Sequence, residues 1–257
     1  MAMSTGRAYY KLRTGVSAVG QSFSRLIWPP TCQNCRKTTP ESTGSLCQDC
    51  WNDILKSTAS TYCPQCGKDA SPYAILNGRC PDCISTEFHF DGIARAGVYH
   101  GALRKMIVNF KAADRTDLDI YFRLLANAAF TAALFASQGE YFVPVPLHWT
   151  RRLMRGYNHA QLIAGVIDHP TARINTDIVR IRRTRLQPGL SPAKRAANVK
   201  GAFLVRRGHP FAGRTLCLVD DVKTTGATLN ECAVTLKEAG AKKVYALVIS
   251  VAGQQVD

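Results

Sequence analysis

The sequence predicts an α/β protein, with a mostly parallel sheet that carries helices on both faces and a small cysteine-rich region before it. Two observations support this fold class. Strand-like and helix-like patterns alternate from Phe90 to Val251, as they do where helices join parallel strands. Eight of the ten cysteines lie between residues 32 and 83, in a segment with too little apolar content for a core of its own. We therefore expect three parts, residues 1–30, 31–86 and 87–257.

The first part has the pattern of a basic amphipathic helix. Apolar residues recur at spacings of three and four from Tyr9 to Leu26, the charged residues are all Lys or Arg, and Pro29 and Pro30 end the pattern. Such a helix could lie on an anionic membrane or resemble an organellar presequence, but we prefer a helix that docks on its own domain. The chain has no apolar run of the length that a transmembrane helix needs, so we expect no transmembrane segment.

The second part contains four Cys-x-x-Cys pairs arranged as a repeat. Corresponding cysteines of the two units lie 31 to 33 residues apart, and the CPQCG turn at 63–67 has the Pro and Gly that a metal knuckle favours, whereas the first unit lacks this Gly. No secretory signal precedes the cysteines, which disfavours disulfides. We expect two zinc ions, simplest as one per consecutive quartet, although a cross-braced arrangement fits the spacing too. The predicted ligands are Cys32, Cys35, Cys47, Cys50, Cys63, Cys66, Cys80 and Cys83.

The third part carries the predicted sheet. Strands are assigned to short apolar runs, and helices to apolar residues three or four apart, such as Leu103, Ile107 and Phe110. In order, we expect a strand or hairpin at 90–99, helices at 102–112 and 118–136, a strand at 141–145, a helix at 158–167, strands at 178–181 and 201–205 separated by a polar loop, a strand at 215–219, a helix at 225–240 and a strand at 243–251. Cys217 and Cys232 fall on this strand and helix, where we expect packing roles.

The segment LCLVDDVKTTGAT, residues 216–228, has the order of a sugar-phosphate site. Paired carboxylates follow a buried strand, at the edge where open α/β sheets bind ligands, and can accept hydrogen bonds from vicinal hydroxyls. The next residues offer backbone N–H groups and hydroxyls at a helix amino end, which suits a phosphate. A ribose 5-phosphate fits both halves. The candidate residues are Asp220, Asp221, Val222, Lys223, Thr224, Thr225, Gly226, Ala227 and Thr228.

This segment resembles the phosphoribosyl pyrophosphate (PRPP) signature of type I phosphoribosyltransferases. The resemblance implies that the paired acids hold the ribose hydroxyls, that the TTGAT loop holds the 5-phosphate, and that magnesium binds with PRPP. Some purine-salvage members have an acid near the start of this loop, where the present chain has Thr224, so purine salvage is less expected than PRPP binding itself. No catalytic residue is assigned.

Two further blocks, residues 144–164 and 182–203, resemble the ComF family, which joins a double zinc ribbon to a phosphoribosyltransferase-like domain. His159 stands where Gln is expected. The resemblance implies a pyrophosphate loop with Val145, Pro146, Leu147, Arg151, Arg152 and Arg155, and a mobile loop over the site with Gln187, Arg195 and Asn198.

Positive charge is concentrated in the middle of the third part. From Arg151 to Arg214 there are 14 Lys or Arg residues and two acids, within a chain of net charge +15. A pyrophosphate needs only two or three cations, so the excess indicates either a polyanionic partner or a solvated basic face. Because ComF proteins act in natural transformation, the resemblance favours single-stranded DNA. The candidate DNA-binding residues are Arg182, Arg183, Arg185, Lys194 and Lys200.

Three functions fit the sequence. The preferred one is a ComF-like cytoplasmic protein that binds PRPP and handles incoming single-stranded DNA at the inner face of the membrane, with proteins of the DNA-uptake machinery as partners. The second is an active phosphoribosyltransferase whose acceptor the sequence does not name. The third is a PRPP sensor that regulates a partner without chemistry. Pyrophosphate release separates the second from the others, and DNA binding separates the first from the third.

Overall fold

The computed structural model describes residues 29–39, 45–112, 118–184 and 191–253. The chain divides into two compact units, one ending at Trp51 and one beginning at Asn52, and helix α2 (Gln48–Thr58) contains the division. The predicted amphipathic helix lies outside the described residues except for its last two positions, as do Arg185 and Gln187. The predicted domain boundaries at residues 30 and 86 stay predictions.

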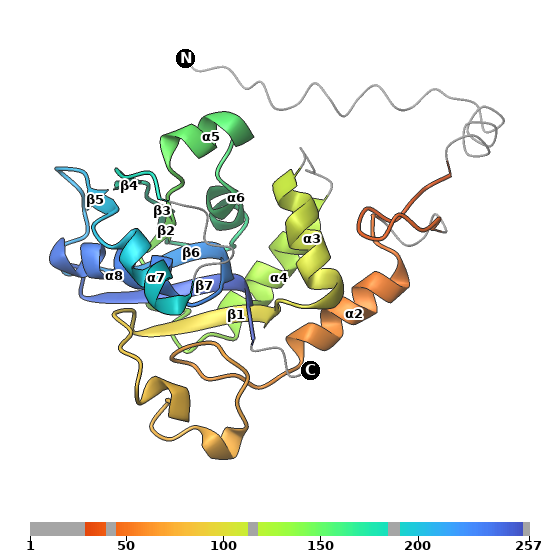
Figure 1. Ribbon diagram of the computed structural model, residues 1–257, viewed down its shortest axis with the longest axis horizontal. Helices are drawn as coiled ribbons and strands as arrows, with labels where there is room; N and C mark the ends of the chain where they lie inside the picture. Colours follow the sequence, from red (N-terminus) through yellow and green to blue (C-terminus); the bar gives the residue numbers. More distant parts are fainter. Residues whose placement is uncertain (1–28, 40–44, 113–117, 185–190, 254–257) are drawn as a thin grey trace. The chain divides into compact units, whose positions relative to one another are not determined.

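Five parallel strands form the sheet of the second unit, in the order β1-β7-β6-β2-β3 (Figure 1). Parallel pairing joins every neighbouring pair of these strands. The apolar run from Leu216 to Val219 is buried throughout, as expected for a parallel strand covered on both faces. The strands are β1 (Gly92–Val98), β2 (Tyr141–Pro144), β3 (Arg173–Ile174), β6 (Thr215–Lys223) and β7 (Lys243–Val251).

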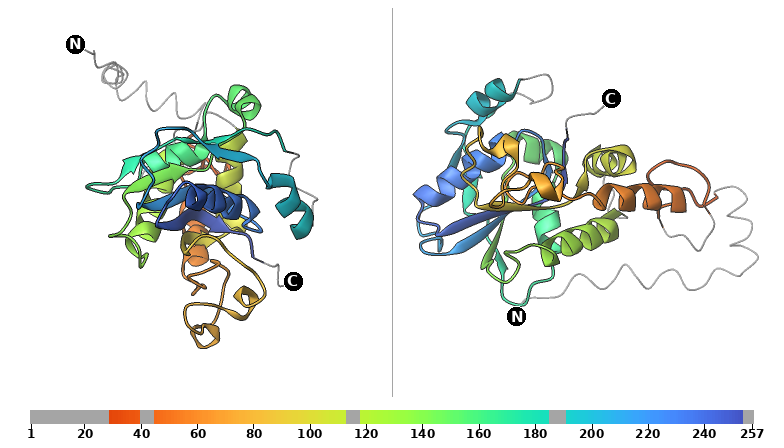
Figure 2. Two further views of the ribbon diagram at one scale, coloured as in Figure 1. Left: turned by 90° about the vertical axis from the view of Figure 1, so that its left-hand side faces the viewer. Right: turned by 90° about the horizontal axis from the view of Figure 1, so that it is seen from below.

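Helices cover both faces of this sheet (Figure 2). On one face, Leu216 and Leu218 pack in a single buried cluster with Leu229 of α8. On the other face, Phe142 of β2 contacts Phe130 of α4, with ring centroids 5.2 Å apart. The helices are α3 (Gly101–Ala112), α4 (Asp119–Thr131), α5 (Trp149–Arg155), α6 (His159–Gly165), α7 (Pro192–Val199) and α8 (Ala227–Glu238).

Two strands predicted after the third helix do not join the main sheet. β4 (Ile178–Arg180) and β5 (Phe203–Val205) pair with each other, antiparallel, in a separate two-stranded sheet. The segment between them was expected to be a polar loop, but its described part contains helix α7. Ser191 caps this helix by accepting a hydrogen bond from Lys194 N, and Pro192 occupies the first turn, where a missing N–H is tolerated.

The α/β class, the parallel sheet with helices on both faces and the cysteine-rich region before it are confirmed. Cys217 and Cys232 are fully buried in the second unit, and burial raises the pKa of both thiols. Within the described ranges, no helix has the length and apolar character needed to cross a membrane.

Candidate functional site

The two cysteine quartets are built as two copies of one knuckle. In the first copy Cys32 N donates to Lys37 O at 2.8 Å, and in the second Cys63 N donates to Lys68 O at 2.9 Å. Each turn is closed by an isolated antiparallel bridge between the residues that flank it. Short 3-10 helices at Pro72–Ala74 and Pro81–Cys83 complete the second copy. The repeat of the first Cys-x-x-Cys pair is therefore a repeat of backbone structure, whereas the second pair enters helix α2 in one quartet and a 3-10 helix in the other.

The sulfur atoms of each quartet gather in one place. All the Sγ atoms within a quartet lie within 4.8 Å of one another, and four of these pairs are 3.6 to 3.7 Å apart. A tetrahedral zinc with Zn–S bonds of about 2.3 Å places its sulfurs about 3.8 Å apart, so both quartets fit this ion. The arrangement is one site per consecutive quartet, not cross-braced: Cys32, Cys35, Cys47 and Cys50, then Cys63, Cys66, Cys80 and Cys83.

The residue after the second cysteine adopts the left-handed conformation in both knuckles. It is Gly67 in the second, with φ of 75°, and Arg36 in the first, with φ of 66°. The turn of the first knuckle thus forms without the Gly that the sequence lacks there. A side chain at such a φ is strained by roughly 1–2 kcal/mol, so the first knuckle retains a local strain that the second avoids.

Backbone donors around the first cysteine of each quartet favour its thiolate. Burial by itself would raise the pKa of Cys32, but N–H groups of Cys35, Cys47 and Asn34 outweigh burial and lower this pKa to about 6. The pKa of Cys63 is lowered in the same way, by N–H groups of residues 66, 65 and 80. Zinc binds thiolates, so these donors prepare each quartet for the metal, which would supply folding energy to its knuckle.

The second knuckle packs directly on strand β1 of the sheet. Ile93 N donates to Pro64 O at 2.8 Å, and Gln65 Nε2 donates to Phe90 O at 2.9 Å. A Cβ on Gly67 would come within 3.0 Å of Val251 Cγ2, so the absent side chain lets the knuckle approach the sheet closely. Arg95 of β1, 4% exposed, reaches back to the knuckle and pairs with the Asp69 carboxylate.

A cavity of about 460 Å³ lies at the carboxyl edge of the main sheet. The paired acids line it from within β6, which extends to Lys223, four residues past the strand end predicted at Val219. The segment Val145–Leu147 that follows β2 lines it too. The strand-to-helix loop before α8 closes another side. Of the residues predicted to bind PRPP, all except Thr225 line this cavity, namely Asp220, Asp221, Val222, Lys223, Thr224, Gly226, Ala227 and Thr228.

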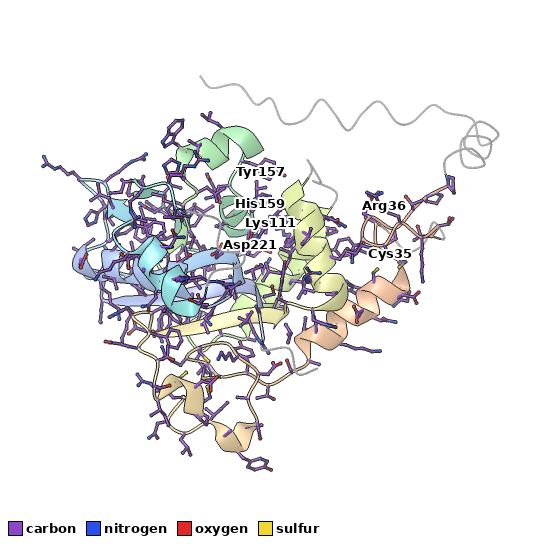
Figure 3. All side chains as sticks on the ribbon, in the orientation of Figure 1. Cys35, Arg36, Lys111, Tyr157, His159 and Asp221 are labelled. Atoms are coloured by element: carbon purple, nitrogen blue, oxygen red, sulfur yellow. The ribbon has the colours of Figure 1, made fainter. Side chains whose placement is uncertain are left out.

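Asp220 and Asp221 occupy different electrostatic environments. Burial, and next the charge of Asp221, raise the pKa of Asp220 to about 7. The backbone N–H of Asp221 donates to Asp220 Oδ1 at 2.9 Å, and Lys111 Nζ lies 2.8 Å from Asp221 Oδ2. The Lys111 charge acts against the rise in the Asp220 pKa. Lys111, His159 and Asp221 lie close together in Figure 3, and all three line the cavity.

The loop before α8 depends on a glycine. Gly226 has φ of 84°, and a Cβ there would lie 2.9 Å from Lys223 Cε. The Lys223 side chain passes beneath the loop: it is 2% exposed, and its ammonium lies 5.5 Å from the centre of the Phe88 ring. Burial lowers the pKa of Lys223. Thr225 Oγ1 accepts a hydrogen bond from the N–H of Ala227, the first residue of α8, at 3.4 Å, whereas the N-cap position itself is Gly226.

The predicted pyrophosphate loop divides between two places. Val145, Pro146 and Leu147 line the main cavity, whereas Arg152 lines a smaller neighbouring cavity. Arg151, Arg152 and Arg155 lie on helix α5, which the sequence did not predict. His148 caps this helix by accepting from Thr150 N at 3.4 Å.

The predicted mobile loop contributes Arg195, which lines the main cavity from helix α7. Asn198 of the same helix is not part of that lining; its carbonyl accepts from the Arg182 guanidinium at 3.2 Å. Arg182 also donates to Lys200 O at 2.5 Å. This arginine therefore joins the two ends of residues 182–200, here called the α7 segment. The other described DNA-binding candidates, Arg183, Lys194 and Lys200, are exposed.

Several residues that line the main cavity carried no site prediction: Tyr99, Lys111, Asn158, His159 and Arg180. Asn158 had a local signal in the sequence, because it caps α6. Its Nδ2 also donates to Val145 O at 3.0 Å, which holds the predicted pyrophosphate loop. Lys111 had no local signal: it ends a helix 110 residues before its partner Asp221, and only the fold brings the two together.

Comparisons with known proteins identify relatives of this chain. Residues 23–84 match the family model of a double zinc ribbon domain. The chain is 32% identical to "Competence protein F" of Haemophilus influenzae, over 83% of this chain and 93% of the relative. It is 30% identical to "DNA utilization protein YhgH" of Escherichia coli K12, over 85% and 96%, and 25% identical to "Competence protein ComFC" of Bacillus subtilis, over 76% and 79%. Since the similarity spans both the cysteine repeat and the sheet domain, the chain belongs to the ComF family.

Proposed function

We propose that this protein binds PRPP, as its magnesium complex, at the carboxyl edge of the sheet and handles single-stranded DNA during DNA uptake. The observation that carries the PRPP half is the main cavity. It brings the paired acids of β6, the loop before α8 and the segment Val145–Leu147 to one space. These are the three parts that a ribose, its 5-phosphate and its diphosphate require.

Each part of the cavity suits one part of PRPP. Asp220 and Asp221 are carboxylates at a strand end and can accept hydrogen bonds from the ribose hydroxyls. The loop from Thr224 to Thr228 opens a 12-residue helix, whose first N–H groups have no partner within the helix and favour a phosphate. Arg195 and the Val145–Leu147 segment remain for the diphosphate.

Magnesium fits the same acids. Its preferred ligands are oxygens, and Asp220 and Asp221 offer carboxylate oxygens on the cavity wall. The ion would offset part of the negative charge that PRPP brings beside these two carboxylates. Lys111, paired with Asp221, contributes a further positive charge on the protein side.

Calorimetric titration of the protein with PRPP in the presence of magnesium tests this half. Wild type should bind, and the D220N/D221N double variant should bind about a hundredfold more weakly or worse, because charged hydrogen bonds are removed. D168N, which neutralises an exposed acid outside the cavity, serves as the control and should bind like wild type. Failure of the wild type to bind PRPP would refute the PRPP proposal.

The DNA half rests on the local basic excess and on the relatives that are named competence and DNA utilization proteins. This half of the proposal implies a cytoplasmic protein that acts at the inner face of the membrane, together with proteins of the DNA-uptake machinery. Affinity for single-stranded DNA should fall with salt by a logarithmic slope of about 0.7 for each phosphate neutralised. The R183Q/K200Q variant should lower this slope, whereas K105Q/K242Q, which removes two exposed charges elsewhere, should change it less. A flat salt response in wild type would contradict the proposal.

Transferase activity is the competing function, and the diphosphate position beside Val145–Leu147 is the feature that favours it. Incubation of the PRPP complex with nucleobases and DNA, with pyrophosphate release as the readout, separates the two. Release that depends on one acceptor and is lost in D220N/D221N would make this protein an enzyme. Binding of PRPP without release under any condition would exclude the transferase, and DNA binding would then separate the DNA-handling function from a PRPP sensor.

A further inference from the structure

A second cavity, of about 240 Å³, lies beside the one assigned to PRPP. The two share part of their walls, formed by Pro146, Leu147, Asn158 and Arg180. The second cavity therefore lies next to the predicted pyrophosphate loop, and it also has lining residues of its own, from helix α5 and from the antiparallel pair of strands β4 and β5 with the residues beside them.

The second cavity is cationic. Arg152, Arg180 and Arg206 line it, and none of its described lining residues is acidic. Neighbouring residues hold two of these arginines in position. Arg180 lies over the Phe203 ring, with its guanidinium carbon 5.4 Å from the ring centre, and Arg206 N donates to Asp177 O at 2.9 Å. Three arginines in the lining of one cavity favour an anion with several oxygens, such as a phosphodiester.

Trp149 gives this cavity an aromatic rim. It is the first residue of α5, lines the cavity and is 64% exposed. Trp149 also lines an open depression together with Arg152 and Leu153, and Leu153 is 75% exposed. An exposed indole next to clustered arginines matches a nucleic acid strand, because a base can stack on the ring while its phosphates meet the guanidinium groups.

We infer that a single DNA strand binds across this second cavity, with a base stacked on Trp149 and backbone phosphates held by Arg152, Arg180 and Arg206. This inference rests on the proposed DNA-handling function and gives it a location separate from the candidates of the α7 segment. The strand would run beside the pyrophosphate loop, next to bound PRPP. Gln161, also in the lining and exposed, offers an amide group to the same strand.

Fluorescence anisotropy with a labelled oligothymidine tests the inference. W149A should weaken binding about tenfold or more, since stacking one base contributes on the order of 1–3 kcal/mol, and W149F should restore most of the affinity. R206Q should lower the logarithmic salt slope by about 0.7. R207Q removes the same charge from the next residue, which is exposed and outside the cavity lining, and should change the slope less.

Two controls distinguish the possible failures. Y73A removes a tyrosine that is 96% exposed on the second cysteine segment and should leave DNA binding unchanged. If wild type does not bind the oligonucleotide, the DNA-handling function fails. If wild type binds but W149A and R206Q bind equally well, or Y73A weakens binding instead, the strand lies elsewhere and this inference alone fails. Weaker binding of W149A to anionic vesicles, with unchanged DNA binding, would assign the surface to a membrane and overturn it too.

Discussion

The raised pKa of Asp220 predicts that PRPP binding depends on pH in a particular direction. With a pKa of about 7, roughly a tenth of the Asp220 side chains are ionised at pH 6 and roughly nine-tenths at pH 8. If the carboxylate is the form that binds the ribose or magnesium, the competent fraction rises about tenfold over this range, and the association constant rises with it. The expected gain is about 1.4 kcal/mol.

The assay is calorimetric titration with PRPP and magnesium at both pH values, in wild type and in D220N. PRPP itself titrates near pH 6, so both proteins share that contribution, and their difference isolates Asp220. Between pH 6 and pH 8, the association constant of wild type should rise by a factor about ten times larger than that of D220N. Loss of native-state stability should not disturb the measurement at pH 6. A carboxyl whose pKa is raised on folding makes the native state more stable as the pH falls below 7. An equal pH effect in the two proteins would refute the role of Asp220.

Three further outcomes are expected. Metal analysis of protein purified under reducing conditions should find two zinc ions per chain, and one or none would contradict the tandem sites. Gly226→Ala should destabilise the protein to chemical denaturant by more than Gly208→Ala and should weaken PRPP binding, since Gly208 has a similar φ of 79° but open space around its Cβ position. Equal losses of stability in the two variants would mean that the Lys223 side chain moves away from the added Cβ freely. Arg36→Gly should slow zinc release to a chelator by relieving about 1 kcal/mol of backbone strain, whereas Gly67→Ala should speed it.

The sequence predicted the parts of the fold that depend on local pattern. The last strand was placed at its observed bounds, Lys243–Val251, because its apolar run is long, begins after two lysines and ends shortly before Gly253. The order of strand, carboxylates and helix start led to Asp220, Asp221 and the loop before α8, which line one cavity; their roles toward PRPP stay predictions. Cysteine spacing predicted the grouping into consecutive quartets as the simplest arrangement.

What the sequence did not predict depends on contacts between distant segments. Lys111 reaches Asp221 only because the fold brings the last turn of α3 beside the paired acids of β6, and nothing local marks it. Helix α5 was missed because a single turn or two of helix gives too short a pattern, although His148 caps it. The second cavity, with Arg180 and Arg206, arises because β4 and β5 pair with each other instead of joining the main sheet. That choice of partner is not visible in either strand alone.

Strand β1 is at the end of the strand order, so one of its edges has no neighbouring strand in the main sheet. The second cysteine knuckle lies against that strand, and the Ile93 N–H donates to the Pro64 carbonyl of the knuckle. An uncovered edge strand offers its backbone groups to other chains. Removal of zinc from the second quartet would loosen this cover, so we expect the metal-depleted protein to self-associate through β1 before its sheet unfolds.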